Sequence, residues 1–493
     1  MSADIRTPAE PGIAPDMAPD MAPVTPMWIA GRAVTTGRTL EVRDPYRGDV
    51  VGRVPIARAE DVRAAVDAGA ASGLRLTRAE RARILRGIAA RIEVERDEIA
   101  VLITRESGLS LKDSRFEVSR ALDVLTLAAD CTSRDDGALY AGDIGRNGKK
   151  RRIVSQLEPV GLVATISPFN HPLNQVVHKV APAVAAGAPV VLKPSEKTPL
   201  TALVFARIAY EAGLPGAMLS VLTGDPAEIC DVLLASPQVK LVSFTGSPRV
   251  GKALAARVGY RRVVMELGGN DPLIVMEDAD LDAAAQLAVS GAFANSGQRC
   301  TAVKRILAQD TIADALVARM EALTRALVCG DPLDEETDVG TVIDADAAIA
   351  IERRIAPTLA AGARAVVPFA RDGARIAPCL FDHVPPDAPL VMEETFGPVA
   401  PVIRFRTVDE ALAIANGTAF GLSAGLCTQR LDWIVRFAEG LEVGGLNVGE
   451  VPGYRTELSP FGGVKDSGLG HKEGVVEAIR LYSTVKTISL PWF

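Results

Sequence analysis

The sequence is poor in aromatic residues and in cysteine. Phe, Trp and Tyr make up 4% of the 493 residues, and the six cysteines are scattered without a Cys-x-x-Cys pair. That scatter argues against a structural zinc site and against a disulfide framework. We therefore expect no bound metal, and we expect a chain that folds in a reducing cytoplasm.

An excess of positive charge and a long apolar run are missing as well. The formal net charge is −7, and no basic block with interleaved aromatic residues is present, which argues against a nucleic-acid partner. No apolar stretch reaches the roughly 18 residues that a membrane-spanning helix needs. The sequence begins without a basic segment followed by an apolar one, so we expect no signal peptide and no membrane partner.

Small aliphatic residues dominate what is present, and the chain is long enough for two or three domains. From residue 160 onward, apolar β-like runs alternate with amphipathic helical patterns. This alternation predicts βαβ units and a parallel sheet, that is, a Rossmann-like nucleotide domain. The predicted strands are 160–166, 189–192, 219–222, 239–244 and 262–265, and the predicted helices are 174–186, 200–212, 226–235 and 248–258.

Polar breaks follow four of these strands and carry groups that can do chemistry. They contain Asn170, the Lys193 to Glu196 stretch, Thr245-Gly246-Ser247, and Glu266 with Gly268. Parallel sheets bind ligands outside the carboxyl ends of their strands. The chain has no G-x-G-x-x-G motif, but residues 246–251 can present N–H groups to a pyrophosphate at a helix start. A short Gly-Ser segment of this kind is also compatible with an ordinary turn.

A second α/β segment, residues 272–448, contains the most reactive candidate. Cys300 lies in a short polar break between a helical pattern at 281–294 and a β-like run at 303–308. Arg299 and nearby backbone N–H groups are expected to favour its thiolate. Taken alone, Cys300 is better explained as a small apolar core residue.

Six ordered motifs together resemble the NAD(P)-dependent aldehyde dehydrogenase superfamily. The motifs are Asn170, Lys193-Pro194-Ser195-Glu196, Phe244-Thr245-Gly246-Ser247, Glu266-Leu267-Gly268-Gly269, Gly297-Gln298-Arg299-Cys300 and Glu394-Thr395-Phe396-Gly397-Pro398. The resemblance implies an α/β fold with a Rossmann-like cofactor domain, an α/β catalytic domain and a small β oligomerisation arm, assembled as homodimers or homotetramers. We assign residues 1–26 to a disordered tail, 27–139 and 158–271 to the NAD-binding domain, 272–455 to the catalytic domain, and 140–157 and 480–493 to the arm.

The same resemblance assigns catalytic roles. Cys300 is the expected nucleophile, and the Asn170 amide with the Cys300 backbone N–H is the expected oxyanion site. Glu266 is the expected general base, with a partly buried carboxylate and a raised pKa. Because members that pass the acyl group to coenzyme A generally lack this glutamate, hydrolysis to a free acid is favoured. Lys193 is also placed in the catalytic set.

The implied cofactor is NAD, with NADP possible. Lys193 and Glu196 are expected at the adenosine ribose, where a carboxylate repels a 2′-phosphate. Ser247 is expected at the pyrophosphate, and Glu394 and Phe396 at the nicotinamide ribose and ring. The remaining predicted cofactor contacts are Ile166, Ser167, Pro168, Phe169, Ser195, Gly224, Phe244, Thr245, Gly246, Val250, Leu267 and Gly268.

Basic residues close to these motifs predict an anionic substrate. Arg120, His171, Arg299 and Arg455, with Thr301 beside the nucleophile, form a predicted socket for a phosphonate, phosphate or carboxylate. Each of them singly is also compatible with a surface salt bridge.

The runs 148–152, 168–175, 451–455 and 463–468 are similar to those of members that oxidise phosphonoacetaldehyde to phosphonoacetate. Members acting on glyceraldehyde 3-phosphate without phosphorylation, on lactaldehyde or on succinate semialdehyde share most of these residues and stay open as alternatives. Two other classes also stay open, a redox-free cysteine esterase using Cys300 and Glu266, and a binding protein without turnover.

Overall fold

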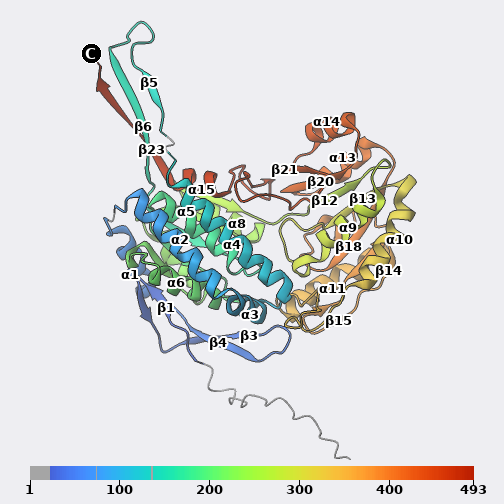
Figure 1. The fold of residues 1–493 in the computed structure, drawn as a ribbon. Coiled ribbons are helices and arrows are strands. Elements are labelled where there is room, and N and C mark those ends of the chain that lie inside the picture. Colours follow the sequence, from blue (N-terminus) through green and yellow to red (C-terminus); the bar gives the residue numbers. More distant parts are fainter. Residues whose placement is uncertain (1–22, 74, 135–136, 493) are drawn as a thin grey trace, which may run out of the picture.

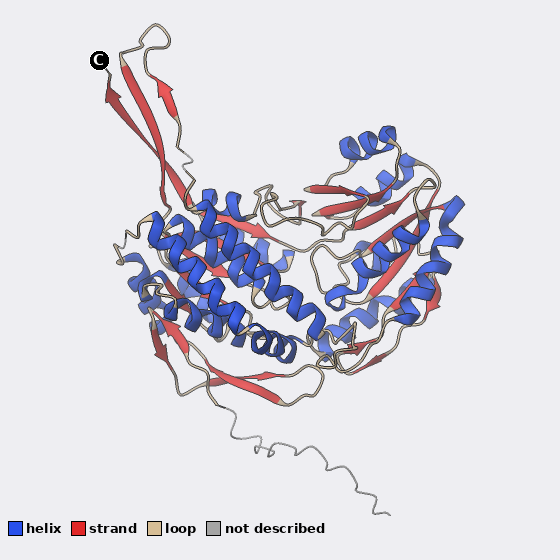
Figure 2. Cartoon of the chain, viewed as in Figure 1, coloured by secondary structure: helices blue, strands red, loops and turns tan. Residues whose placement is uncertain are grey.

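Two α/β units and a projecting β arm make up this computed structural model, which describes residues 23–73, 75–134 and 137–492 (Figure 1). Figure 2 shows that helices pack around a sheet in each unit, whereas the arm contains strands alone. Most of the predicted N-terminal tail, residues 1–22, lies outside the described residues.

The first unit is built on a seven-stranded sheet whose central strands are parallel. Its order is β11 (Arg262–Glu266), β10 (Val239–Thr245), β7 (Leu162–Ile166), β8 (Val190–Lys193), β9 (Leu219–Val221), β1 (Met27–Ile29) and β2 (Arg32–Val34). Every residue of β7 and β8 is buried, as expected for strands covered on both faces. The predicted parallel sheet is confirmed.

Helices cover this sheet, and capping residues set several of their ends. They are α1 (Ala59–Ala70), α2 (Arg78–Val94), α3 (Arg96–Ser107), α4 (Leu111–Cys131), α5 (Asn174–Ala186), α6 (Leu200–Glu211), α7 (Pro226–Ala235) and α8 (Pro248–Val258). Thr77 and Glu80 form a capping box at α2, and α5 ends at Gly187, whose φ of 84° suits glycine. A two-stranded ribbon, β3 (Thr39–Arg43) with β4 (Val50–Pro55), lies beside these helices.

The second unit has its own seven-stranded sheet. Its order is β14 (Arg364–Val367), β17 (Cys379–Asp382), β18 (Val399–Phe405), β13 (Arg305–Gln309), β12 (Pro272–Val275), β20 (Ser423–Cys427) and β21 (Gly445–Val448). Ile274 joins one apolar core and its neighbours Leu273 and Val275 join another, because successive strand residues face opposite sides. Both faces of this sheet are therefore covered by apolar side chains.

Helices from both sides complete those two cores. The helices α9 (Leu281–Phe293) and α10 (Asp310–Ala326) supply one core. The helices α11 (Ala345–Ala360), α12 (Pro389–Met392), α13 (Val408–Asn416) and α14 (Leu431–Gly440) supply the other. Short strands β15 (Arg371–Asp372), β16 (Arg375–Ile376), β19 (Phe420–Gly421) and β22 (Val464–Lys465) form two small ribbons.

The arm combines distant parts of the chain. β23 (Ser483–Pro491) pairs antiparallel with β6 (Arg151–Pro159) over nine residue pairs, and β5 (Leu139–Ala141) pairs with the other edge of β6. The two segments assigned to the arm, 140–157 and 480–493, therefore pair with each other, and the arm leaves the body of the protein (Figure 1). The helix α15 (Val475–Leu481) precedes β23 and returns to the first core through Val475 and Ile479. Among the described residues no helix is long and apolar enough to cross a membrane.

Candidate functional site

Strand register gathers the predicted polar residues at one edge of the first sheet. Ile166, the last residue of β7, is paired with Lys193 on one side and with Phe244 on the other. Thr245 is paired in turn with Glu266 at the end of β11. The breaks that carry Asn170, Lys193, Ser247 and Glu266 therefore begin side by side.

A buried glutamate of α4 fixes the turn that contains Asn170. Glu117 Oε1 accepts hydrogen bonds from the backbone N–H groups of Leu173 (2.7 Å) and Asn174 (2.9 Å), which are free donors at the start of α5. The Asn170 side chain is buried, and its Nδ2 donates to the carbonyl oxygen of Gln298 at 2.8 Å. This bond joins the first sheet to the segment that carries Cys300.

An unusual backbone leads to Cys300. The helix α9 ends at Phe293, and the following turn contains Asn295, Ser296 and Gly297 at φ values of 58°, 51° and 69°. Three consecutive left-handed residues are costly for an L-amino-acid chain and need support from their surroundings. A Cβ on Gly297 would lie 2.2 Å from the Gly397 carbonyl oxygen, so glycine is required there.

Two charged side chains hold this turn in place. Asp113 Oδ2, on α4, accepts the backbone N–H of Asn295 at 2.8 Å. Lys304 Nζ donates to the carbonyl oxygens of Arg299 (2.6 Å), Cys300 (2.8 Å) and Gly269 (2.8 Å), and it lies 3.0 Å from Glu394 Oε1. Lys304 thus ties the Cys300 turn both to the end of β11 and to the Glu394 segment.

The Arg299 and Cys300 charges attract each other, as expected, but burial outweighs the attraction that positive charges exert on the thiolate. Burial raises the pKa of Cys300 to about 11, against the opposing pull of the Lys304 and Arg455 charges. The sequence could not show this, because desolvation depends on the surrounding tertiary structure. Burial therefore disfavours the thiolate form of Cys300.

Glu266 has the environment expected of a general base. Burial and the nearby Glu473 carboxylate raise the pKa of Glu266 well above the ordinary value, as predicted. Neither of its carboxylate oxygens accepts a hydrogen bond from any residue that the structure describes. Lys179, which is fully buried, lies 3.6 Å from Glu473 Oε1 and donates to Ser243 Oγ at 2.8 Å.

The first sheet's edge fits a dinucleotide. Ser247 caps α8 by accepting the Val250 N–H at 3.4 Å, and Thr245 Oγ1 is buried without a partner among the described atoms. A Cβ on Gly246 would lie 2.5 Å from the Phe244 ring, and one on Gly268 would lie 2.1 Å from Glu394 Oε2. Gly246 and Gly268 thus leave room for the Phe244 ring and the Glu394 carboxylate, and the helix start at Ser247 offers backbone N–H groups that suit a pyrophosphate.

Lys193 and Glu196 form a pair beside that edge. Lys193 is almost fully buried, and its Nζ donates to Glu196 Oε2 at 2.8 Å. Burial opposes ionisation of Glu196, but attraction to Lys193 outweighs it and lowers the pKa of this carboxyl group. Glu196 therefore presents a fixed negative charge, as expected for a carboxylate that accepts ribose hydroxyls.

The other predicted cofactor contacts lie around the same edge of the first sheet. Two of them, Gly224 and Val250, lie at its margin. Phe169 and Phe396 make an edge-to-face contact with ring centroids 5.8 Å apart. Gly224 follows β9 and packs against the backbone of Ile56 and Ala57, and Val250 lies exposed in the first turn of α8. Ile166, Ser167, Pro168, Ser195 and Leu267 belong to the strand ends and breaks at this edge.

The predicted basic residues also gather beside Cys300. The positive charge of Arg455 acts on both Cys300 and Glu266, and its guanidinium carbon lies 3.9 Å from the centre of the Phe461 ring. A Cβ on Gly453 would lie 2.6 Å from Thr301 Oγ1, so the Arg455 loop packs directly against the Cys300 segment. Arg120 reaches this loop through a salt bridge to Glu457 (2.7 Å).

Arg299 and His171 are held by neighbouring groups. Arg299 Nη2 donates to the Gly291 carbonyl oxygen at 2.9 Å, and its Nε is buried without a partner among the described atoms. Asp113 attracts Arg299, although burial is the larger effect and lowers its pKa. His171 Nδ1 lies 3.4 Å from Glu117 Oε2. Both side chains thus remain next to the turn that carries Cys300.

Sequence reasoning missed the residues that support this arrangement. They are Asp113, Glu117, His178, Lys179, Lys304, Glu457 and Glu473. Asp113, Glu117 and Arg120 are spaced four and three residues apart, which places them on one face of α4. That spacing was a usable signal, whereas nothing local marks Lys179 or Glu473.

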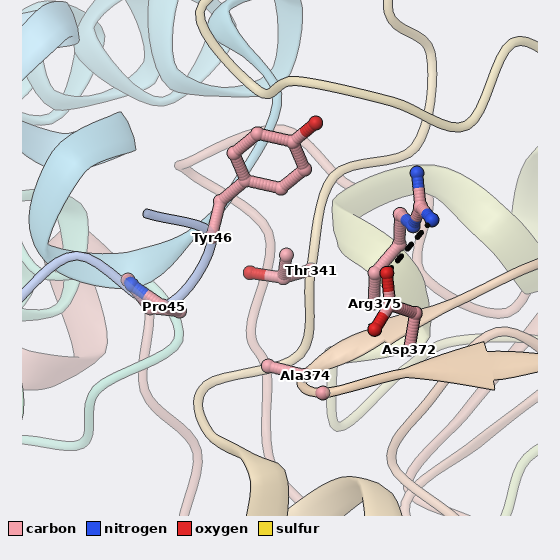
Figure 3. Close-up of a pocket in the computed structure, with 7 residues that line it drawn as sticks. Pro45, Tyr46, Thr341, Asp372, Ala374 and Arg375 are labelled. Atoms are coloured by element: carbon pink, nitrogen blue, oxygen red, sulfur yellow. Dashed lines mark hydrogen bonds and ion pairs between the residues drawn. The ribbon is translucent and has the colours of Figure 1, made fainter. Parts of the chain in front are cut away.

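A cavity elsewhere in the molecule contains none of the predicted residues. It has a volume of about 410 Å³ and is lined by Pro45, Tyr46, Thr341 and residues 372–375 (Figure 3). Its one arginine, Arg375, turns toward Asp372 with an Nη2 to Oδ2 distance of 3.2 Å. The chemistry-capable groups are concentrated around Cys300 instead.

Comparisons with known proteins agree with this geometry. The model of the aldehyde dehydrogenase family matches residues 32–488. The chain is 38% identical to the 3-sulfolactaldehyde dehydrogenase of Priestia aryabhattai, over 94% of this chain and 97% of that protein. It is 36% identical to the sulfoacetaldehyde dehydrogenase of Neptuniibacter caesariensis, over 91% and 99%.

Solved structures agree as well. The NADP-dependent glyceraldehyde-3-phosphate dehydrogenase from Bacillus halodurans C-125, complexed with NADP, superimposes with a TM-score of 0.92 at 33% identity, covering 95% of this chain and 99% of that one. A cysteine, an asparagine amide and a buried glutamate therefore meet beside a dinucleotide edge in a fold shared with such enzymes. The chain belongs to the aldehyde dehydrogenase family and is an NAD(P)-dependent oxidoreductase that acts on aldehydes.

Proposed function

We propose that the protein oxidises a small aldehyde bearing an anionic group to its carboxylic acid, with phosphonoacetaldehyde to phosphonoacetate as the first choice. The observation that carries this proposal is the position of Arg455 beside Cys300 and Glu266. Within the described residues, Arg455 makes no ion pair with a carboxylate within 4.0 Å, unlike Arg120. A partly buried guanidinium of this kind is suited to bind an acidic group of a ligand.

The proposed reaction begins at Cys300. Its thiolate adds to the aldehyde carbon, which forms a C–S bond and places negative charge on the former carbonyl oxygen. Asn170 Nδ2, now bonded to the Gln298 carbonyl oxygen, would rotate its donor to that oxygen together with the Cys300 backbone N–H. A dinucleotide held by Glu196, Ser247 and Glu394 would supply the acceptor for the hydride that leaves this carbon.

The remaining thioester on Cys300 is then hydrolysed. Glu266 takes a proton from a water molecule, which attacks the thioester carbon and releases the acid and the thiolate. A carboxylate with a raised pKa is basic enough for this task. The buried Glu473 carboxylate contributes to this rise, and the Lys179 charge opposes it.

The relatives support an anionic substrate without fixing which one. Their names specify aldehydes that carry a sulfonate, a phosphate or a carboxylate. A sulfonate aldehyde is the second candidate, because relatives named for such substrates are 36–38% identical over more than nine-tenths of this chain. Lactaldehyde, glyceraldehyde 3-phosphate and succinate semialdehyde are further alternatives.

The dinucleotide is proposed to be chiefly NAD. The Glu196 charge would repel a 2′-phosphate while accepting hydrogen bonds from ribose hydroxyls. We also propose a cytoplasmic homodimer or homotetramer, in which the projecting arm contacts another subunit.

NADH formation across a panel of aldehydes tests the proposal. The panel contains phosphonoacetaldehyde, sulfoacetaldehyde, 3-sulfolactaldehyde, succinate semialdehyde, glyceraldehyde 3-phosphate, lactaldehyde and neutral propionaldehyde. We expect kcat/KM for phosphonoacetaldehyde to exceed that for propionaldehyde at least about tenfold, since one charged contact contributes about 1.5–3 kcal/mol. Equal values for anionic and neutral aldehydes would contradict the proposal, and ester cleavage without NADH formation would favour the esterase.

Two variants examine the socket itself. Arg455→Ala and Arg299→Ala are each expected to lower kcat/KM for the anionic aldehyde about 10- to 150-fold, while the value for propionaldehyde changes within about a factor of two. Arg299 also supports the Cys300 turn through Gly291, so its variant additionally needs a check of thermal stability. If both variants keep kcat/KM for phosphonoacetaldehyde within about twofold of the parent value, Arg455 and Arg299 do not bind its anionic group.

A further inference from the structure

A buried carboxylate lies among the residues proposed to bind the substrate's anionic group. Glu457 follows Arg455 by two residues, and only 6% of its surface is exposed. Its backbone carbonyl oxygen accepts the Val475 N–H at 3.0 Å, which anchors the loop to the start of α15. A negative charge in such a place opposes binding of an anion unless it has another task.

The contacts of Glu457 tie the loop to two helices. Its Oε1 accepts from Arg120 Nε at 2.8 Å and lies 2.7 Å from Arg120 Nη2. Its Oε2 lies 2.9 Å from Nε2 of the buried His178 on α5. Glu457 thus contacts one edge of the Arg120 guanidinium group, through Nε and Nη2. The Nη1 atom of Arg120 is not part of this contact.

The charges around Glu457 keep it ionised. Burial opposes ionisation, but attraction to His178, Arg120 and Arg455 outweighs it, so the pKa of Glu457 is far below its ordinary value. Burial also lowers the pKa of His178, against the opposing effect of the Glu457 carboxylate. Glu457 therefore compensates one of the two guanidinium groups, Arg120 and Arg455, and leaves a positive surplus beside Cys300.

Fixing Arg120 has a clear advantage for binding. A free arginine side chain loses part of its rotamer freedom when it binds a ligand. In this protein the carboxylate has already ordered the guanidinium group before substrate arrives. Such preorganisation raises affinity without adding a contact to the substrate.

We propose that Glu457 is a positioning residue for substrate specificity, which holds Arg120 by one edge so that the other edge meets the anionic group of the aldehyde. This inference rests on the proposed function, because it requires an anionic substrate. A positioning role of Glu457 differs from a general structural role in the substrates that its loss affects. Loss of Glu457 should penalise anionic aldehydes alone.

The test compares Glu457→Gln with the parent enzyme on phosphonoacetaldehyde and propionaldehyde. We expect KM for phosphonoacetaldehyde to rise at least about fivefold, while its kcat and the kcat/KM for propionaldehyde stay within about twofold. The matched control is Glu95→Gln, which removes the carboxylate that pairs with Arg207 of α6 from the junction between α2 and α3, elsewhere in the unit. The control variant should have the same kcat and KM as the parent enzyme for both aldehydes.

A double-variant cycle then shows whether Glu457 acts through Arg120. Arg120→Ala combined with Glu457→Gln should be no worse for phosphonoacetaldehyde than Arg120→Ala alone. Additive losses would overturn the proposal, as would a fall in KM in Glu457→Gln, since that would show that Glu457 competes with substrate for Arg120. An equal loss on both aldehydes would mark a structural role and would also overturn it.

Two further outcomes complete the test. If Glu457→Gln does not fold, Arg120→Lys is tested instead, because lysine keeps the charge but has no guanidinium edge for Glu457 to hold. Arg120→Lys should give the same selective rise in KM for phosphonoacetaldehyde. KM values equal to those of the parent enzyme would overturn the proposal. If the parent enzyme itself does not prefer anionic aldehydes, the proposed function fails and this inference fails with it. A parent that prefers them and a Glu457→Gln variant that matches it would overturn the positioning role alone.

Discussion

The side-chain amide of Asn170 donates a 2.8 Å hydrogen bond to the carbonyl oxygen of Gln298, two residues before Cys300. A donor is therefore already aimed at the Cys300 segment from the end of the first sheet. Asn295 Nδ2 supports the same position by donating to the Asn170 carbonyl oxygen at 3.1 Å. The side-chain amide and the backbone carbonyl of Asn170 are thus both bonded to the segment that carries Cys300.

Replacing that donor should slow the chemical step. We expect Asn170→Ala to lower kcat about 100- to 1,000-fold, which is the usual effect of removing one oxyanion donor. Dinucleotide binding should be retained, because the predicted contacts to it lie elsewhere along the sheet edge. The measurement is the pre-steady-state rate of NADH formation, and an unchanged rate would contradict the role of Asn170.

The thiol of Cys300 should be unreactive in the enzyme without dinucleotide. Because its pKa is raised to about 11, the thiolate fraction should rise about tenfold per pH unit between roughly pH 7 and 9. We expect the rate of alkylation by iodoacetamide to follow this rise without a plateau. Mass spectrometry of the Cys300 peptide measures the rate, with Cys300→Ser as the control. A plateau below about pH 8 would show a much lower pKa.

The Glu473 carboxylate should set the pH dependence of thioester hydrolysis. Glu266 has a raised pKa, so its basic form is present above that pKa and is lost as the pH falls through it. Glu473→Gln removes one of the two causes of the rise, and the acidic limb of the hydrolysis rate should therefore move to lower pH. Single-turnover measurements of acid release across pH test this expectation. A limb that does not move would show that burial alone raises the pKa.

The charge of Glu196 should govern the choice of dinucleotide. Glu196→Ser removes the carboxylate that Lys193 holds at 2.8 Å, and it should raise the ratio of kcat/KM for NADP to that for NAD at least about tenfold. Lys193 would then be free to attract the 2′-phosphate. Steady-state kinetics with both dinucleotides provide the ratio. An unchanged ratio would show that Glu196 does not contact the ribose.

Much of the first unit could be predicted because its signals are local. The helices α5 and α8 have the predicted bounds, since buried apolar runs and the caps at Gly187 and Ser247 define them in sequence. The apolar pattern upstream of the sheet predicts a helix over 115–129, but α4 begins earlier, at Leu111. Ser110 caps it by accepting the Asp113 N–H at 3.2 Å, a signal that was present and not used.

Other features of the site depend on contacts between distant segments. Lys179 meets Glu473 only after the chain has folded, and the raised pKa of Cys300 follows from burial that no local pattern reveals. The left-handed backbone at Asn295 and Ser296 is equally hidden, because neither residue type is reserved for that conformation. These features arise from tertiary packing, which overrides local preference.

The left-handed turn before Cys300 has a consequence for engineering. A turn that is fixed by Asp113, Lys304 and the close approach of Gly297 to Gly397 tolerates few replacements, so libraries aimed there would mostly yield inactive protein. The neighbouring loop offers more freedom, because Tyr454 and Leu458 are 59% and 44% exposed. Efforts to broaden the range of accepted aldehydes should therefore randomise that loop and leave the turn intact.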